Sequence, residues 1–401
     1  MPEKIILELA IVIASAAVLA VAAHYLRQPL VVAYIAAGFL IGPHSPVPGL
    51  ALMEQADFIR GVGELGLVLL LFLLGLVLHP GRLLQVFRQA SLVTLCSAAA
   101  FFGVGLGLAL AVGHVMGESL SLAPMHAVFI GFATAFSSTL LAVKLLPTRR
   151  LHESAVGTIA IGILIVQDVL AILVLVAMAV LGPGGGAARG IWWRLPMGIA
   201  MLAAAFPVEQ YGLRRLMRHV EQYPELLFVL GVAWCFVLAE GAEALGFSRE
   251  IGAFVAGLAL ARSPLSLYIW QKVAPLRDFF IILLFFSLGA LVDVRSTPLG
   301  ALLLAVLLGL VLVLVKPYLF RLFLRAVRTE RRLAEEAGWR LGQCSEFGLV
   351  VAFLALDQGL IGRQAFEIIL VTTLLSFLVS TYIVVLKYPS PLGVSPGMHQ
   401  V

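Results

Sequence analysis

Apolar stretches recur from one end of the chain to the other, and short polar segments separate them. A helix of about twenty apolar residues spans the hydrocarbon core of a bilayer, whereas a barrel strand needs only about ten residues. The pattern therefore predicts an all-α polytopic membrane protein with about 13 transmembrane helices. The predicted span cores are Ile5–Ala23, Val31–Ile41, Val62–Leu78, Ser91–Val112, Ala127–Leu145, Ala155–Leu181, Ile191–Phe206, Leu226–Leu245, Ile251–Ala261, Phe279–Val292, Leu299–Leu324, Leu341–Leu356 and Phe366–Lys387.

The charged residues are few and unevenly placed. Only 12% of the residues are charged and 61% are hydrophobic, whereas about a quarter of a soluble domain is charged. Most of the 27 lysines and arginines follow odd-numbered spans or lie near the C-terminus. Because cytoplasmic loops are enriched in these residues, we expect an external N-terminus and a cytoplasmic C-terminus in a bacterial inner membrane. Since the net charge of +5 lies in such loops, no nucleic-acid partner is expected.

An odd number of spans permits two inverted six-helix repeats joined by a linker span. The seventh span would be that linker, and the glycine-rich segment 182–186 precedes it. Two halves of opposite topology are a plan that many transporters share.

The segment GILIVQDVLAILVLV interrupts the apolar pattern, because it places Gln167 and Asp168 in the middle of the sixth predicted span. A charge at the bilayer centre costs about 2.5–3.5 kcal/mol on insertion scales, so a residue of this kind is a candidate functional group. Burial raises the pKa of a carboxyl group, and a nearby cation lowers that pKa. An aspartate balanced between these effects can hold a proton in one state and a metal cation in another. The alternative is a structural carboxyl that stays protonated or paired.

Lys316 is a second charged residue within a span, in the segment GLVLVLVKPYLF. One interpretation is a countercharge for Asp168 when no cation is bound. The other is a lysine that pairs helices or extends towards the cytoplasmic end of its helix. Pro317 has no backbone N–H, so the helix is expected to bend beside the lysine.

Polar residues also interrupt the fifth and twelfth predicted spans. Those of the fifth include Thr134, Ser137 and Ser138, and those of the twelfth are Gln343, Ser345 and Glu346. Polar runs are tolerated in hydrocarbon where a helix unwinds and lines a cavity, and the ends of half-helices can coordinate ions. We therefore expect two broken, crossing helices at corresponding places in the two repeats. The alternative is hydroxyl groups that bond back to carbonyls of intact helices.

The sequence gives no sign of an enzyme. It contains no Walker loop, Rossmann fingerprint, zinc-ligand pair or potassium-filter motif, and no cofactor is expected. Asp168 is the only aspartate at the centre of a span, whereas an intramembrane aspartyl protease needs two.

Ordered blocks of sequence resemble the cation:proton antiporter family that includes Kef-type potassium efflux proteins and bacterial sodium/proton antiporters. The similarity covers residues 10–385. Its blocks, in chain order, are YIAAGFLIGPH, GELGLVLLLFLLGLVL, FSSTLLAVKLL, VQDVLAILVL, EIGAFVAGLALA, PLRDFFIILLFFSLGALVD and GQCSEFGLVVAF.

The resemblance implies the sodium/proton antiporter fold, a homodimer and elevator-type alternating access. Residues 1–88 and 222–297 would form the dimerisation scaffold, and residues 89–181 and 298–387 would form the ion-transporting core. Residues 182–221 would hold the linker helix, and residues 388–401 would be a cytoplasmic tail. Asp168 would carry cation and proton in turn, and Lys316 would match the family's membrane lysine. Neutral ligand oxygens would come from Gln167, Thr134, Ser137 and Ser138, with Gln343, Ser345 and Glu346 supporting the second broken helix.

The Gln–Asp pair favours potassium, and sodium remains the alternative because selectivity depends on cavity geometry. A carboxamide offers an oxygen but does not titrate near neutral pH, so a single carboxylate favours electroneutral exchange of one proton for one cation. A non-transporting cation sensor and a passive cation channel are the rival functions, because a fold alone does not fix function.

Regulation is expected to differ from that of full Kef-type proteins, which continue into a cytoplasmic nucleotide-fold domain. The sequence ends shortly after the last predicted span, and its SLYIWQKVAP segment lacks the acidic cluster of those proteins. We therefore do not expect glutathione gating, and leave open a separate regulatory subunit. The basic stretch Arg321–Arg340 is expected to face the cytoplasm and to bind anionic lipid.

Overall fold

The computed structural model describes residues 2–47, 49–53, 57–77, 80–116, 122–145, 155–181, 189–220, 222–293 and 295–388. All regular elements in these ranges are helices. The chain forms two compact units. The first unit comprises Met1–Ala16, Tyr34–Leu84 and Leu175–Leu291, and the second comprises Ala17–Ala33, Gln85–Val174 and Val292–Val401.

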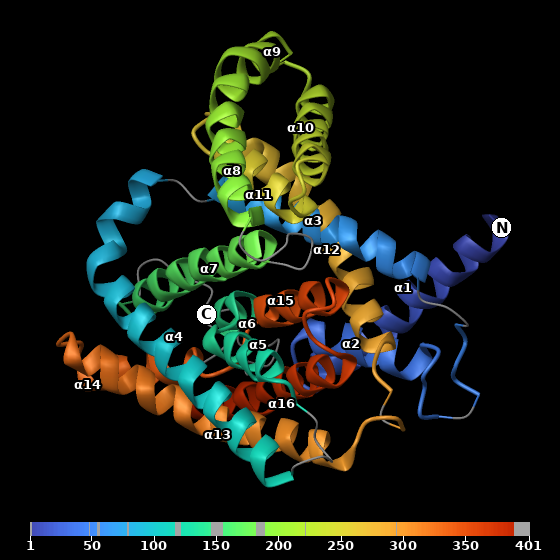
Figure 1. The fold of residues 1–401 in the computed structure, drawn as a ribbon, viewed down its shortest axis with the longest axis vertical. Coiled ribbons are helices and arrows are strands. Elements are labelled where there is room, and N and C mark those ends of the chain that lie inside the picture. Colours follow the sequence, from blue (N-terminus) through green and yellow to red (C-terminus); the bar gives the residue numbers. More distant parts are fainter. Residues whose placement is uncertain are drawn as a thin grey trace, which may run out of the picture. The chain divides into compact units, whose positions relative to one another are not determined.

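The first unit is built around α3, which packs against α11 and α12 (Figure 1). Its elements are α2 (Leu30–Ile41) from Tyr34, α3 (Asp57–Val77), α8 (Arg189–Pro207), the π-helix η3 (Val208–Leu213), α9 (Arg214–His219), α10 (Pro224–Ala244), α11 (Arg249–Leu260) and α12 (Ser266–Ala290). Glycines let α3 and α11 approach closely, because a Cβ on Gly257 would lie 2.0 Å from the Phe72 carbonyl oxygen. Small residues at helix contacts are typical of membrane proteins.

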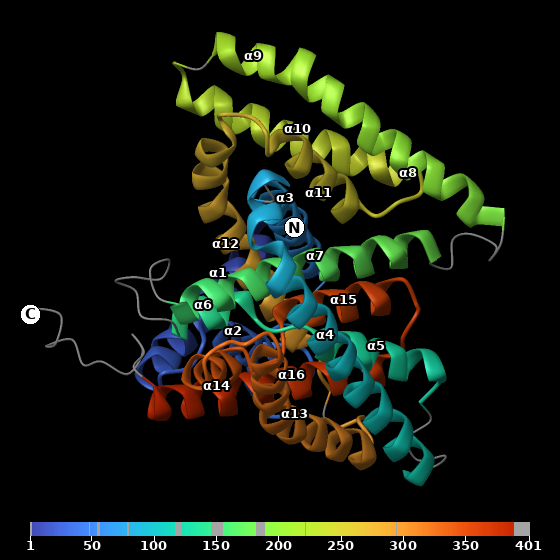
Figure 2. The same ribbon diagram turned by 90° about the vertical axis from the view of Figure 1, so that its left-hand side faces the viewer.

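The second unit contains both helices whose polar residues predicted a break. Its elements are α4 (Pro80–Met116) from Gln85, α5 (Pro124–Ala135), α6 (Thr139–Leu145), α7 (Ala155–Leu181) up to Val174, α13 (Leu299–Ala326), α14 (Arg331–Arg340), α15 (Glu346–Asp357) and α16 (Arg363–Lys387). In this unit α13 packs against α14 and α16, and α15 packs against α5 and α16 (Figure 2). Helix α1 (Pro2–Tyr25) is divided between the units after Ala16.

Every predicted span core overlaps at least one helix. Seven helices of the described residues are long and apolar enough to span a membrane, and shorter apolar helices lie at Leu30–Ile41, Gly61–Leu76 and Pro124–Ala135. The chain is therefore a multi-pass helical membrane protein. The number of thirteen spans, the inverted repeats, and the scaffold and core roles stay predictions.

Two boundaries differ from the predicted ones. The tenth predicted span is only the second half of α12, which begins at Ser266 and buries Ile269 and Val273 in its first half. The basic stretch before the twelfth span is not wholly surface, because it forms α14 and buries Arg340 completely. The first half of α12 and the whole of α14 contain many polar and charged residues, so their sequences show no long apolar run that would predict a helix. The predicted glycine-rich linker 182–186 and the tail 389–401 lie outside the described residues.

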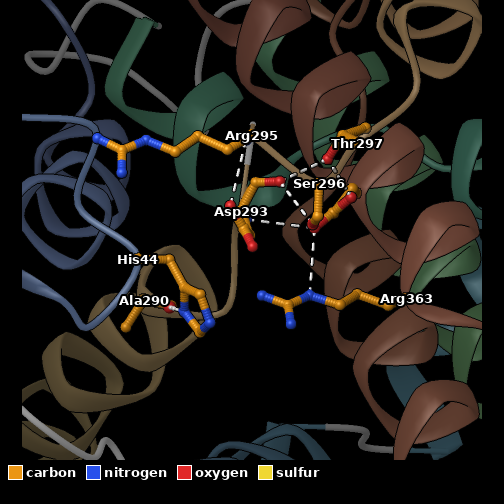
Figure 3. A network of polar contacts seen from close by, with 8 residues as sticks. His44, Ala290, Asp293, Arg295, Ser296, Thr297 and Arg363 are labelled. Atoms are coloured by element: carbon orange, nitrogen blue, oxygen red, sulfur yellow. Dashed lines mark hydrogen bonds and ion pairs between the residues drawn. The ribbon is translucent and has the colours of Figure 1, made fainter.

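A polar cluster fastens the segment before α13 to the first turn of α16 (Figure 3). The Glu367 side chain is buried and accepts hydrogen bonds from the Thr297 hydroxyl at 2.6 Å and the Asp293 backbone N–H at 3.3 Å. Arg363 Nε donates to the same carboxylate at 3.3 Å. Because a buried carboxylate is costly unless it is bonded in this way, the cluster holds the start of α13 firmly against α16.

Candidate functional site

The first predicted broken helix is interrupted between α5 and α6. Helix α5 ends at Ala135, Phe136 has an extended backbone, and α6 begins at Thr139. Ser138 caps the new helix, because its Oγ accepts a hydrogen bond from the Leu141 backbone N–H at 3.0 Å. A serine side chain at this position satisfies one of the N–H groups that the start of a helix leaves unpaired. We call residues 136–138 the first break.

Helix α7 brings Gln167 and Asp168 to the first break. Asp168 is buried, with 8% of its surface exposed, and its carboxylate oxygens accept from the Thr139 hydroxyl at 3.2 and 3.4 Å. Gln167 Oε1 accepts a hydrogen bond from the Ser137 backbone N–H at 3.0 Å. Because a backbone N–H can only donate, this bond fixes which way the Gln167 amide is turned. Two neighbouring residues of α7 thus contact this region. The Gln167 amide is bonded to the break itself, and the Asp168 carboxylate is bonded to Thr139 at the start of α6.

The second predicted broken helix is interrupted between α14 and α15, at residues 341–345, which we call the second break. Ser345 caps α15 by accepting from the Phe347 backbone N–H at 3.0 Å. The Cys344 N–H donates to Ser376 Oγ at 3.0 Å. The Gln343 side chain accepts from Ser380 Oγ and donates to the Ser138 carbonyl, each at 3.4 Å. The second break is thus bonded to α16 and to the first break.

Lys316 joins the two breaks from α13. Its ammonium group donates to the carbonyl oxygens of Thr134 at 3.1 Å, Phe136 at 2.6 Å and Gln343 at 3.0 Å. The same group lies 4.8 Å from the centre of the Phe101 ring. An ammonium has three N–H donors, so all three are satisfied. Two of the acceptors lie at the C-terminal end of α5, where unpaired carbonyls and the helix dipole favour a positive charge.

Close packing around Pro317 sets the position of Lys316. A Cβ on Gly342 would lie 2.7 Å from Pro317 Cγ, and one on Gly338 would lie 2.7 Å from the Pro317 carbonyl oxygen. Only glycine allows α14 and the second break to approach α13 this closely. This packing places the lysine beside both breaks, and the bend expected at Pro317 stays a prediction.

The predicted site residues are all in the second unit. The hydroxyls of some are bonded to the backbone, whereas other polar side-chain atoms have no hydrogen-bond partner among the described residues. Thr134 Oγ1 donates to the Gly131 carbonyl oxygen at 2.8 Å and also lies 3.2 Å from that of Phe101. Ser138 and Ser345 cap helices, as described above. Ser137 Oγ and Gln167 Nε2 are buried and have no hydrogen-bond partner among the described residues. The Ser137 hydroxyl in the first break therefore remains available to a ligand, whereas the Thr134 hydroxyl is used in a hydrogen bond to the Gly131 carbonyl oxygen.

Lys316 and Thr139 differ most from expectation. The expected pairing of Lys316 with Asp168 is not formed in the part of the chain that the structure describes, because the ammonium is bonded to carbonyls instead. Thr139, which was not among the predicted ligands, is the residue whose side chain contacts Asp168. The sequence could have pointed to Thr139, because it directly follows Ser137 and Ser138 and begins the second half of the broken helix. Glu346 is buried and lies in the first turn of α15.

The arrangement can hold a small cation among oxygens. Asp168 supplies a carboxylate, and Thr139 and Ser137 supply neutral hydroxyl oxygens, the ligand type that hard cations prefer. No group of three or more His, Cys, Asp or Glu side chains with metal-site geometry occurs among the described residues. This donor set does not resemble a transition-metal site, in which imidazole and thiolate ligands are common.

Comparison with known proteins agrees with this geometry. The family model described as "Sodium/hydrogen exchanger, transmembrane" matches residues 11–386. K(+) efflux antiporter 5 of Arabidopsis thaliana is 29% identical over 97% of this chain and 67% of its own length. A putative K(+) efflux antiporter KefB of Alkalimonas amylolytica is 29% identical over 89% of this chain and 52% of its own length. The chain thus spans between half and two thirds of these relatives.

Two further likenesses bear on the cation and the fold. The iron transporter MagA of Paramagnetospirillum magneticum is 29% identical over 89% of this chain and 80% of its own length. The solved structure of the sodium proton antiporter MjNhaP1 from Methanocaldococcus jannaschii covers 98% of the chain with a TM-score of 0.60 at 18% identity, which shows a shared fold. Because the family model covers nearly the whole chain, the protein belongs to the sodium/hydrogen exchanger family.

Proposed function

We propose that the protein is a cation:proton antiporter in which Asp168 holds a proton and a monovalent cation in turn. The observation that carries this proposal is a buried carboxylate whose single hydrogen-bond partner among the described residues is a hydroxyl, Thr139. A carboxylate without a neighbouring ammonium can be neutralised either by a proton or by a cation, and the two exclude each other. Membership of the sodium/hydrogen exchanger family supports the same activity.

The neutral ligands of the cation are Thr139 and Ser137 in this proposal. Gln167 holds the first break through the Ser137 N–H, so its amide orients the backbone around the ion. Lys316 neutralises the carbonyl ends of both breaks, and keeps the half-helices together while the cation binds and leaves. Its countercharge role towards Asp168 would require a conformation in which these carbonyl contacts are exchanged for an ion pair.

Potassium is the proposed cation, because several relatives are named K(+) efflux antiporters. Sodium is the second candidate. With one proton and one cation competing for Asp168, exchange is electroneutral. The proposed transport cycle is an elevator-type movement of the core against the scaffold within a homodimer, with the N-terminus outside and the C-terminus in the cytoplasm.

Proton flux in liposomes tests this function. The purified protein would be reconstituted with a pH-sensitive dye inside and an imposed pH gradient, and potassium, sodium, lithium and iron(II) would be added in turn. We expect potassium to collapse the gradient at a rate that does not change when valinomycin sets the membrane potential. Asp168→Asn should abolish the collapse, while Asp357→Asn, at the far end of α15, should preserve it.

The outcomes separate the rival functions. A gradient that collapses with sodium alone would replace potassium by sodium. Cation flux without proton movement, in correctly inserted protein, would indicate a channel. Cation binding without flux of either ion would indicate a sensor. Exchange that persists in Asp168→Asn would remove Asp168 from the mechanism.

A further inference from the structure

An apolar stripe runs along one exposed face of α13. Seven large apolar side chains recur at intervals of three or four residues, which places them on one side of a helix. They are Leu299, Leu303, Leu307, Leu310, Leu314, Tyr318 and Leu322, and all are exposed. The stripe is about 35 Å long at 1.5 Å per residue, which is close to the roughly 30 Å of a bilayer's hydrocarbon core. The stripe therefore faces lipid, and its two ends lie near the two headgroup layers.

One end of this stripe continues into arginines. Arg321 and Arg325 follow Leu314 at seven and eleven residues, so they extend the same face of α13. Arg328 lies in the turn after α13, and Arg331 and Arg332 begin α14. Of these five, all but the half-buried Arg321 are exposed. We call the five residues the arginine surface.

The arginine surface has no acidic partner within the described ranges of the chain. None of its five guanidinium groups makes an ion pair or a hydrogen bond to another described residue. The two acids in the middle of α14 are already engaged, because Glu336 pairs with Arg340 and Glu335 pairs with Lys387. Glu330 is the remaining acid of the described segment 321–340, so the five arginines exceed the acids left to pair with them there.

Arg328 occupies a backbone conformation that favours glycine. Its φ is 65°, and the turn is closed by bonds from the Arg328 N–H to the Arg325 carbonyl and from the Thr329 N–H to the Leu324 carbonyl. This is the Schellman arrangement, in which the left-handed residue is usually glycine. An L-residue there is sterically strained, because its Cβ comes close to backbone atoms. An arginine at this position is therefore unfavourable for the turn, and its charge is a reason for its presence.

We propose that the arginine surface binds the headgroup of an acidic phospholipid whose acyl chains lie along the apolar stripe of α13. The continuity of the stripe with the arginines favours a lipid over a soluble anion, because a soluble anion would make no use of the stripe. Arginine forms bidentate hydrogen bonds with phosphate oxygens, and several unpaired guanidiniums satisfy one headgroup better than one does. The bound lipid stabilises the junction between α13 and α14.

Lipid-dependent thermal unfolding tests this proposal. The full-length protein in detergent would be titrated with phosphatidylglycerol, and unfolding would be followed by tryptophan fluorescence. We expect a saturable rise in Tm with phosphatidylglycerol and no such rise with phosphatidylcholine or inorganic phosphate. The double variant Arg325→Gln/Arg331→Gln should bind phosphatidylglycerol about 25-fold more weakly, since each arginine near an anionic headgroup contributes about fivefold.

Three further variants separate the proposed lipid site from a generic effect of charge. Arg215→Gln/Arg218→Gln removes two exposed arginines of α9 and should leave the response to phosphatidylglycerol within about twofold of the wild type. Arg328→Gly should raise Tm in the absence of lipid and weaken the lipid response about fivefold, while Arg328→Lys should retain most of the response. Equal losses in both double variants, a saturable effect of inorganic phosphate, or a full lipid response in Arg328→Gly would each overturn the proposal.

Discussion

The two breaks share a plan but differ in how completely their polar groups are bonded. In the second break, Cys344 and Gln343 are hydrogen-bonded to α16, and Gln343 is also bonded to Lys316 of α13 and to the first break. Ser345 caps α15. In the first break the hydroxyl of Ser137 has no partner among the described residues, and the neighbouring α7 carries a buried carboxylate. The second break thus joins neighbouring elements through hydrogen bonds. In the proposed function, the first break keeps a hydroxyl oxygen available for an ion.

Under the proposed function, this difference explains why the ion site needs two breaks. Polar backbone in hydrocarbon is costly unless it is bonded, so an open site can exist only beside a structure that bonds everything else. Lys316 provides that bonding on both sides, because one ammonium reaches carbonyls of both breaks. The availability of oxygens near Asp168 therefore depends on the completeness of the contacts around Lys316.

The largest effect is expected from Lys316→Met, which removes the group that serves both breaks. Three buried carbonyls would lose their donor at about 1–3 kcal/mol each, so the free energy of unfolding should fall by at least about 3 kcal/mol. Unfolding in detergent, followed by tryptophan fluorescence, measures this. Lys387→Met is the matched control, because Lys387 forms an exposed pair with Glu335 and should lose less than about 1 kcal/mol. Equal effects of the two variants would contradict the role of Lys316.

Thr139→Val tests the proposed ion site beside the first break. The variant keeps the side-chain shape but removes the hydroxyl that contacts Asp168, and a hydrogen bond to a charged group contributes about 1.5–3 kcal/mol. The apparent cation affinity in the liposome assay should therefore fall by at least about tenfold. Thr139→Ser retains the hydroxyl and should stay close to wild type. A wild-type affinity in Thr139→Val would exclude Thr139 as a ligand.

Ser345→Ala tests the structural role of the second break. Loss of an N-cap hydroxyl costs about 1 kcal/mol, so the variant should unfold at a lower temperature. Because the hydrogen bond described for the Ser345 hydroxyl lies at the start of α15, the cation concentration for half-maximal flux should not change. A stable Ser345→Ala protein with altered cation affinity would reverse the assignment of the two breaks.

Ser137→Ala should have the smallest effect on stability and still alter transport. The Ser137 hydroxyl has no hydrogen-bond partner among the residues described, so its removal should change the free energy of unfolding by less than about 0.5 kcal/mol. The affinity for the cation should fall several-fold, as measured by proton flux against cation concentration. A loss of stability comparable to that of Ser345→Ala would show that Ser137 also fastens its break.

Much of the fold could be predicted because apolar length and polar interruption are local signals. The runs around Asp168 and Lys316 gave helices α7 and α13 at nearly their observed bounds. The two breaks were predictable for the same reason, since Ser137–Ser138 and Gln343–Ser345 place polar groups where an unbroken helix would face lipid. Helix α14 was missed because its charged residues resemble a surface loop, although it buries Arg340 and packs against α13.

The contacts within the site were harder to predict, because they join residues far apart in the sequence. Thr134 and Thr139 are equivalent as residue types, and only the position of the break decides which hydroxyl bonds a carbonyl and which bonds Asp168. The partners of Lys316 are backbone carbonyls, which no sequence pattern marks. A basic residue and an acidic residue in neighbouring spans suggest an ion pair, but an ammonium is equally well satisfied by the unpaired ends of broken helices.

Cation binding at several pH values tests the central claim most directly, namely that a proton and a cation compete for Asp168. Isothermal titration calorimetry of the purified protein with potassium would give the apparent Kd at each pH. Competition by one proton predicts that Kd rises by about tenfold per pH unit at the acidic end, and that Asp168→Asn loses potassium binding. A Kd that is independent of pH, or unchanged binding in Asp168→Asn, would contradict the account.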